Sequence, residues 1–470
     1  MPRLVRYLLC FSLAVAFVPA ILAAESNDQP GPIKPKVLWV YKSTEHFIAA
    51  PAVGEKLLYV TSIGAFNSGA VRALSLDPAA GEKERVVWTK TAPFLKLPTV
   101  STPVLADGKI VFGDAMHQND GGSLYCLSAD SGATTWQLAL PGSLIHLEGT
   151  PAIANGRVYM GGGNAGVFCV ELDRVTLDGK ELDAKTVAAE LDKKRKALLA
   201  QYEADKKGPD AEFAIEPTDD ALPKPVPKLV WKAGEGKWHV DAGVAVAGDR
   251  VFAATAFLDK EKQGERALVC LSAKDGSLAW KTPLKLNPWS GLIVADGTVL
   301  VGGSSVRLDP EILKGAKGEI VAVGATDGKV QWRKELPGGV VSAAAVHDKV
   351  AIFTATDGRV RCVWLVAGGE HEAGNDRWAY DAGAPIFAGA TIAGDTVYVA
   401  DLHGVVHALN LADGKKLWTL DLQADPAHIG GMIYGTPVVH AGRLYVATCS
   451  VSESEIGGER LPNAVVCIGE

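Results

Sequence analysis

The chain has 470 residues, of which 48% are hydrophobic and 21% are charged, and 51 of them are glycines. This composition excludes a disordered chain and is typical of a globular protein rich in turns. The formal net charge of -7 provides no basic excess to attract a phosphate backbone. We therefore exclude nucleic acid as a main partner.

The N-terminus has the pattern of an export signal. Two arginines precede an apolar run from Tyr7 to Leu22, and two alanines follow it. A retained membrane anchor is the alternative, but the run contains Pro19 and is short for a spanning helix. Cys10 lies too early in the run for a lipoprotein cleavage site. We predict a cleaved signal peptide at 1–24, a linker at 25–36, and a soluble periplasmic or secreted protein without an integral membrane segment.

Residues 37–470 contain an internal repeat. Two apolar strands around a tight turn recur eight times, as in TPVLADGKIVFGD from Thr102 and TPAIANGRVYMGG from Thr150. Turns such as Asp107-Gly108 and Asn155-Gly156 supply the positive φ angles that short hairpins need. A second hairpin follows each first one, so every repeat predicts four strands.

The second hairpin of each repeat ends in a tryptophan. The eight tryptophans are Trp39, Trp88, Trp136, Trp231, Trp280, Trp332, Trp378 and Trp418, and their spacing stays between 40 and 52 residues except across one insertion. Eight repeats of four strands predict an all-β, eight-bladed propeller. The last repeat has no fourth strand of its own, whereas Val37–Tyr41 forms an unpaired strand before the first hairpin. We predict that this N-terminal strand closes the last blade, because closure removes two exposed sheet edges.

The segment from Cys126 to Trp136 resembles a known repeat. Its small residue, its Gly and its final tryptophan are similar to the tryptophan-docking repeat of the pyrroloquinoline-quinone (PQQ) propeller family. That family includes quinoprotein dehydrogenases and the propeller lipoprotein of the outer-membrane β-barrel assembly machine. The resemblance covers nearly the whole chain after the signal and implies that each tryptophan packs between neighbouring blades. Cysteine replaces the family's alanine in several repeats.

Most of the seven cysteines share one position of the repeat, which places them in different blades. These five are Cys126, Cys169, Cys270, Cys362 and Cys467. Equivalent positions in different blades are too far apart for a disulfide. With Cys10 removed and Cys449 outside the pattern, we predict six free and mostly buried thiols.

An inserted arm over 174–226 separates the third and fourth strands of the third repeat. Apolar residues spaced along Ala184 to Lys206 predict a helix with a narrow apolar stripe. The helix could rest on its own propeller as a solvated element, or it could be a docking arm for a partner. The sequence leaves both interpretations open.

Several loops predicted to lie on one face are long, which suggests a recognition surface there. These loops are Gly113–Gly122, Ala256–Arg266, Gly302–Gly318 and Thr448–Asn463. One aligned position just before the innermost strands should line the mouth of the central funnel. Around it, three neighbouring blades carry the candidate ligand site: His146, Glu148, His239, Asp241 and Trp289.

Imidazoles and carboxylates could bind a metal or a polar ligand, and the indole could stack a flat one. The alternative is that these side chains only cap the blade ends by hydrogen bonding. We assign no catalytic residue, no cofactor and no metal from the sequence.

Two functional interpretations follow from the resemblance. In the dehydrogenases, PQQ and calcium lie over the funnel beside a pair of adjacent cysteines, and this chain contains no adjacent cysteines. We therefore predict a non-catalytic, monomeric binding or scaffolding propeller with protein partners in the cell envelope. A PQQ-dependent dehydrogenase is the alternative.

Overall fold

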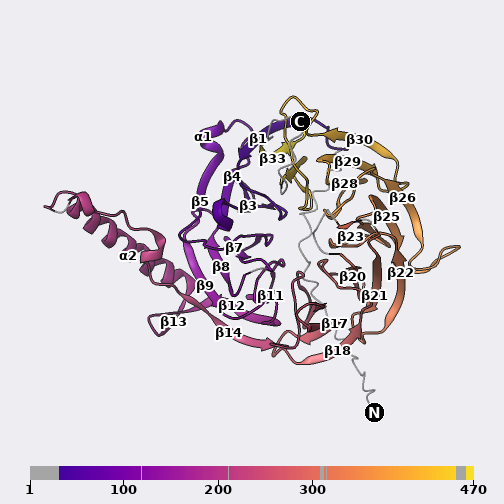
Figure 1. Ribbon diagram of the computed structural model, residues 1–470, viewed down its shortest axis with the longest axis horizontal. Helices are drawn as coiled ribbons and strands as arrows, with labels where there is room; N and C mark the ends of the chain where they lie inside the picture. Colours follow the sequence, from indigo (N-terminus) through magenta and orange to yellow (C-terminus); the bar gives the residue numbers. More distant parts are fainter. Residues whose placement is uncertain (1–30, 118, 210, 307–311, 314, 451–461) are drawn as a thin grey trace, which may run out of the picture.

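The computed structural model describes residues 31–470 except 118, 210, 307–311, 314 and 451–461. The predicted signal peptide at 1–24 and the first half of the predicted linker, 25–30, lie outside the described residues. The described part forms eight antiparallel sheets arranged as the blades of a ring (Figure 1). The predicted eight-bladed propeller is therefore confirmed.

Blades are numbered by the order of their first strands along the chain. Blade 1 contains β2 (Ala52–Val53), β3 (Leu57–Ile63), β4 (Gly69–Ser75) and β5 (Val86–Lys90). Blade 2 contains β6 (Val104–Ala106), β7 (Lys109–Gly113), β8 (Gly122–Ser128) and β9 (Thr134–Leu140). Blade 3 contains β10 (Ala152–Ala154), β11 (Arg157–Gly161), β12 (Val167–Leu177) and β14 (Val226–Ala233), with β13 (Lys180–Asp183) added beside β12. Blade 4 contains β15 (Ala245–Ala247), β16 (Arg250–Leu258), β17 (Gln263–Ser272) and β18 (Leu278–Pro283).

The second half of the ring repeats this order. Blade 5 contains β19 (Ile293–Ala295), β20 (Thr298–Ser304), β21 (Gly318–Gly324) and β22 (Val330–Leu336). Blade 6 contains β23 (Ala345–His347), β24 (Val350–Thr354), β25 (Arg359–Trp364) and β26 (Asp376–Asp381). Blade 7 contains β27 (Thr391–Ala393), β28 (Thr396–Ala400), β29 (Val405–Asn410) and β30 (Lys416–Asp421). Blade 8 contains β31 (Val438–His440), β32 (Arg443–Ala447), β33 (Asn463–Ile468) and β1 (Val37–Ser43).

Burial along each strand follows from its place in the blade. The second strands are buried on both faces, because neighbouring blades cover them; every residue of β24 is buried, for example. The fourth strands lie at the rim, and β30 alternates between exposed and partly buried residues. This alternation is typical of a strand with one face toward water.

The N-terminal strand closes the ring as predicted. β1 pairs antiparallel with β33, and Trp39 lies opposite Cys467 in the register. The pairing joins the two ends of the described chain within one blade, so no blade lacks its outer strand.

Tight turns connect the first two strands of most blades. Asp107, Asn155 and Asp296 have φ angles of 48°, 52° and 45°, and the glycine after each also has a positive φ. These are the turns that the sequence predicts from its Asp-Gly and Asn-Gly pairs.

The tryptophans of the fourth strands lie at the seams between blades. Trp88 donates its indole N–H to the carbonyl of Ala129 in the next blade at 2.8 Å. Five others donate in the same way, at 2.8 to 3.1 Å: Trp136, Trp231, Trp280, Trp332 and Trp378. A Cβ added to Gly132 would lie 2.6 Å from the Trp88 ring, so this close approach requires glycine. At the closing seam, the Arg85 guanidinium lies 4.2 Å from the centroid of Trp39.

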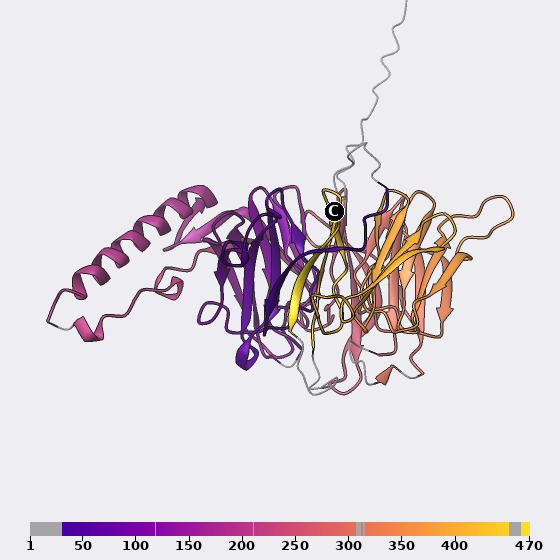
Figure 2. The ribbon, with the colours of Figure 1, turned by 90° about the horizontal axis from the view of Figure 1, so that it is seen from above.

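The insertion forms an arm at the rim of blade 3. The β12 strand continues into the predicted arm as far as Leu177, because β13 and β14 both pair with its extension. The α2 helix (Ala184–Asp205) follows, and its side chains Val187 and Leu191 are buried against blade 3. Figures 1 and 2 show the rest of the arm projecting from the ring. Short helices complete the described structure: η1 (Ala65–Asn67), α1 (Glu82–Arg85), η2 (Ala211–Phe213) and η3 (Asp219–Ala221).

The loops between second and third strands lie on the same face as the links into the first strands. Isolated bridges join the two sets, as between His46 and Ile63 and between Met432 and Cys449. The predicted loop Ala256–Arg266 differs, because β16 and β17 extend into it and pair as far as Leu258 with Gln263. The centre of the predicted loop Thr448–Asn463 lies outside the described residues.

No helix among the described residues is long and apolar enough to cross a membrane.

The closure of the ring gives a first prediction. Deleting Val37–Tyr41 removes Trp39 from a buried cluster and exposes the edge of β33. Losing one large buried aromatic costs about 3 to 5 kcal/mol, so the melting temperature should fall sharply, and the open edge should promote self-association. Calorimetry and size-exclusion chromatography measure both effects. The exposed Lys42→Ala variant is the control, and an unchanged melting curve for the deletion would contradict closure.

The thiols give a second prediction. All six described cysteines are free and buried. Burial raises the pKa of Cys169, Cys362 and Cys449 to about 12, so little reactive thiolate exists at neutral pH. Titration of the chain without its first 24 residues, in denaturant and without reductant, should find six thiols, and the native protein should react slowly. A count of two or fewer would show disulfides.

Candidate functional site

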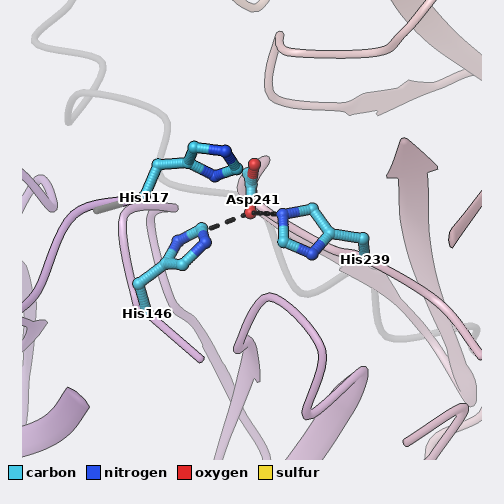
Figure 3. A group of neighbouring side chains, drawn as sticks. All are labelled: His117, His146, His239 and Asp241. Atoms are coloured by element: carbon cyan, nitrogen blue, oxygen red, sulfur yellow. Dashed lines mark ion pairs between the residues drawn. The ribbon is translucent and has the colours of Figure 1, made fainter. Parts of the chain in front are cut away.

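Four titratable side chains from three blades meet on the loop face. His117 lies in the loop between β7 and β8, His146 in the link from β9 to β10, and His239 and Asp241 in the link from β14 to β15. One potential ligand atom from each lies within 4.8 Å of those from the others (Figure 3). The cluster therefore joins blades 2, 3 and 4.

Asp241 lies between two imidazoles. Its Oδ1 is 2.9 Å from His239 Nε2 and 3.5 Å from His146 Nδ1 (Figure 3). His146 Nδ1 is also 3.3 Å from Glu148 Oε1. The side chains of His146 and His239 are fully buried, and that of Asp241 is 5% exposed. These charges and dipoles therefore interact in a region that excludes most water.

Backbone contacts between blades fix His239. Val240 exchanges hydrogen bonds with Gly163 of blade 3, at 2.9 and 3.1 Å. His239 also forms an isolated bridge with Ala256, and its N–H donates to Thr255 Oγ1. Asn164 Oδ1 lies 2.9 Å from His239 Nδ1. The segment and the ring orientation are therefore both held by neighbours outside the cluster.

Two glycines leave room for the imidazoles. A Cβ at Gly163 would overlap the Leu144 carbonyl oxygen and lie 3.3 Å from His146 Nε2. A Cβ at Gly264 would overlap the Ala256 carbonyl oxygen and lie 3.0 Å from His239 Cβ. Both glycines have positive φ angles, 55° and 87°. A side chain at Gly163 or Gly264 would therefore crowd the backbone that positions the two imidazoles.

Asp114 anchors the loop that carries His117. Its carboxylate accepts hydrogen bonds from the Ser123 N–H at 2.5 Å and the Tyr125 hydroxyl at 2.8 Å. Burial raises the pKa of Asp114 to about 6, although both hydrogen bonds act to lower it. The Asp114 carbonyl accepts from the N–H of Leu147, which is next to His146. This contact holds the start of the loop beside the blade 3 link.

The structure brings together four of the five candidate residues: His146, Glu148, His239 and Asp241. Trp289 is partly buried in the next link and is not part of the four-residue cluster. His117 was not among the predicted residues, because it lies in the loop between β7 and β8 and not at the aligned position before the innermost strands. One signal was present: the loop is among the long ones that the sequence places on this face.

The fold and the cluster together define a closed eight-bladed propeller with a buried histidine and carboxylate centre on its loop face. The model of the family described as outer membrane protein assembly factor BamB matches residues 34–189, 227–311 and 289–457. Because these matches cover more than half of the chain, the chain belongs to this family.

Individual relatives are more distant. The chain is 28% identical over 223 residues to the outer membrane protein assembly factor BamB of Burkholderia pseudomallei strain K96243, covering 44% of this chain and 51% of the relative. It is 26% identical over 220 residues to BamB of Yersinia pestis, covering 44% and 48%. The chain therefore matches about half the length of these curated relatives.

Solved structures match almost the whole ring. BamB from Moraxella catarrhalis has a TM-score of 0.55 at 13% identity, covering 92% of this chain and 98% of that one. Quinohemoprotein alcohol dehydrogenase from Comamonas testosteroni has a TM-score of 0.59 at 14% identity, covering 92% and 76%. At these identities the similarity shows the fold alone.

The crowding at Gly163 gives a third prediction. Gly156 also has a positive φ, but a Cβ there would meet no atom within 4 Å. Gly156→Ala should lower the free energy of unfolding by about 1 to 2 kcal/mol, because alanine is strained in the left-handed backbone conformation. Gly163→Ala should lower it by about 1 to 3 kcal/mol more, because its methyl group would also overpack the site. Denaturant unfolding of both variants measures the difference. Equal losses would mean that the backbone around His146 is not tightly packed.

Proposed function

We propose that the protein is an exported, non-catalytic scaffold that holds partner proteins in the cell envelope. The family match over most of the ring carries this proposal. The curated relatives are named as outer membrane protein assembly factors. We extend a role of this kind to the present chain, as a propeller that binds other proteins. That the partners are envelope proteins, and that they dock on the arm described next, is likewise proposed.

The arm is the proposed docking element. Residues 190–226 lie between the segments that match the family model, so the arm distinguishes this chain from the family's shared ring. Beyond α2, Phe213 is 72% exposed and Ile215 is 86% exposed. Large apolar side chains exposed together on a projecting segment are typical of an interaction site.

Contacts at its base hold the arm on the propeller. Val187 and Leu191 of α2 are buried in one cluster with Leu222, from the returning segment. Asp219 forms ion pairs with Arg195 of α2 and with Lys90 on β5 of blade 1. Because both ends of the arm are anchored, less conformational entropy would be lost when a partner binds.

The composition of the arm specifies the partner surface. Glu212 and Glu216 flank Phe213 and Ile215 in the sequence and are exposed. A complementary partner would present an apolar pocket with a basic rim, because opposite charges around an apolar contact favour association.

The dehydrogenase alternative has weaker support. The solved dehydrogenases share the ring at about the same low identity as solved BamB, so neither structure decides between the two functions. The family match and the curated relatives favour the assembly-factor interpretation, and the chain has no pair of adjacent cysteines.

The scaffold proposal is tested by affinity capture from the organism's envelope fraction. Wild-type protein should retain one or more envelope proteins, and the double variant Phe213→Ser, Ile215→Ser should retain them at least about tenfold less, because exposed apolar anchors are worth about 1 to 2 kcal/mol each at an interface. Val366→Ser removes an exposed apolar residue of blade 6, far from the arm, and is the control.

Equal capture by the double variant would contradict docking on the arm, and the absence of any captured envelope protein would contradict the scaffold. Oxidation of alcohols by the protein with PQQ and calcium, lost in Asp241→Asn, would instead favour the dehydrogenase.

A further inference from the structure

We propose that His117, His146, His239 and Asp241 bind a single zinc ion, which fastens the loop of blade 2 to the links of blades 3 and 4. This site is independent of the proposed docking arm. Three imidazoles and one carboxylate are a ligand set that zinc accepts in four-coordinate sites. Calcium and magnesium prefer oxygen ligands, so three imidazoles disfavour both.

The spacing of the ligand atoms fits a metal. In a tetrahedral site with bonds of about 2.0 to 2.1 Å, neighbouring ligand atoms are about 3.3 Å apart. Asp241 Oδ1 is 2.9 Å from His239 Nε2 and 3.5 Å from His146 Nδ1, on either side of that value. A ligand atom of His117 already lies within 4.8 Å of those of the other three residues, so small side-chain rotations would complete the set.

The surroundings of His239 favour a metal over a simple hydrogen bond. Its Nδ1 faces the side-chain oxygen of Asn164 and its Nε2 faces a carboxylate oxygen, so both ring nitrogens meet acceptors. A neutral imidazole has only one N–H to donate. Donation from Nδ1 to Asn164 leaves a lone pair on Nε2 directed toward the cluster, which is the arrangement that a metal-binding histidine uses.

Blade 7 provides an internal comparison. There, His407 Nε2 makes an aligned hydrogen bond of 3.0 Å with Asp401 Oδ2, and its Nδ1 lies 3.2 Å from the Tyr380 hydroxyl, which can donate. This buried histidine therefore has one donor role and one acceptor role, and both are satisfied without a metal. His239 differs because the atoms that face its two ring nitrogens are both oxygens, one from Asn164 and one from Asp241.

The charge of the surrounding side chains also fits a bound divalent cation. Asp241 and Glu148 both lie within 3.5 Å of His146 Nδ1, and their side chains are only 5% and 15% exposed. Two carboxylates would balance the charge of Zn²⁺, and buried charge is stable when it is matched in this way. Glu148 would then act from outside the four ligands.

The test is titration of the metal-free protein with Zn²⁺ by calorimetry and with Co²⁺ by visible absorption. We expect one ion per chain, an intense Co²⁺ spectrum typical of four-coordination, and a melting temperature that rises with zinc concentration, since a ligand bound only by the folded state stabilises it. His117→Ala and Asp241→Asn should each weaken zinc binding by at least about 100-fold, which exceeds the 10- to 100-fold typical of outer-shell changes.

His347→Ala, which removes an exposed histidine of blade 6, is the matched control and should bind as the wild type does. Circular dichroism of the metal-free variants checks that each is folded, and His117, being on a loop, can be removed with little effect on the core. The proposal is overturned if the wild type binds no stoichiometric zinc, or if both cluster variants bind it as tightly as His347→Ala does.

Discussion

The structure depends on closure of the ring. Eight blades pack side by side only if the first and last meet, and pairing of β1 with β33 provides that contact. Each blade then covers the faces of two neighbours, which explains why the second strands are almost entirely buried. The tryptophans reinforce every seam with a large ring, and six of them add a hydrogen bond to the next blade. The positions of all loops and links follow from this closed packing.

Closure also creates the candidate site. His117, His146 and His239 belong to three successive blades and are far apart in the sequence. They meet because the ring places the loop of one blade beside the links of the next two. Direct contacts refine the arrangement: Gly163 bridges to Val240 between blades 3 and 4, and Asp114 contacts Leu147 between blades 2 and 3. A buried polar cluster of this kind is costly unless its members are matched, and a bound dication would match it.

The sequence predicted the ring well and the site in part. The recurring tryptophans and Asp-Gly turns determine blade number and strand order, because both are local signals repeated at a fixed spacing. The same alignment predicted that His146 and His239 occupy equivalent places in neighbouring blades. It could not predict His117, because loop length and sequence between the second and third strands vary from blade to blade, or the role of Asn164, which depends on contacts across a seam. It also missed the extension of β16 and β17, since strand length beyond the repeat is set by pairing.

Our two proposals assign different tasks to different parts of one chain: the arm at the rim of blade 3 would contact a partner, and a metal ion at the loop face would hold the links of neighbouring blades together. The most direct measurement is anomalous diffraction from crystals of the zinc-loaded protein at the zinc absorption edge. The account predicts one strong peak about 2.0 to 2.2 Å from ligand atoms of His117, His146, His239 and Asp241. A map with no peak among these side chains, or with zinc bound only at surface histidines such as His347, would contradict it.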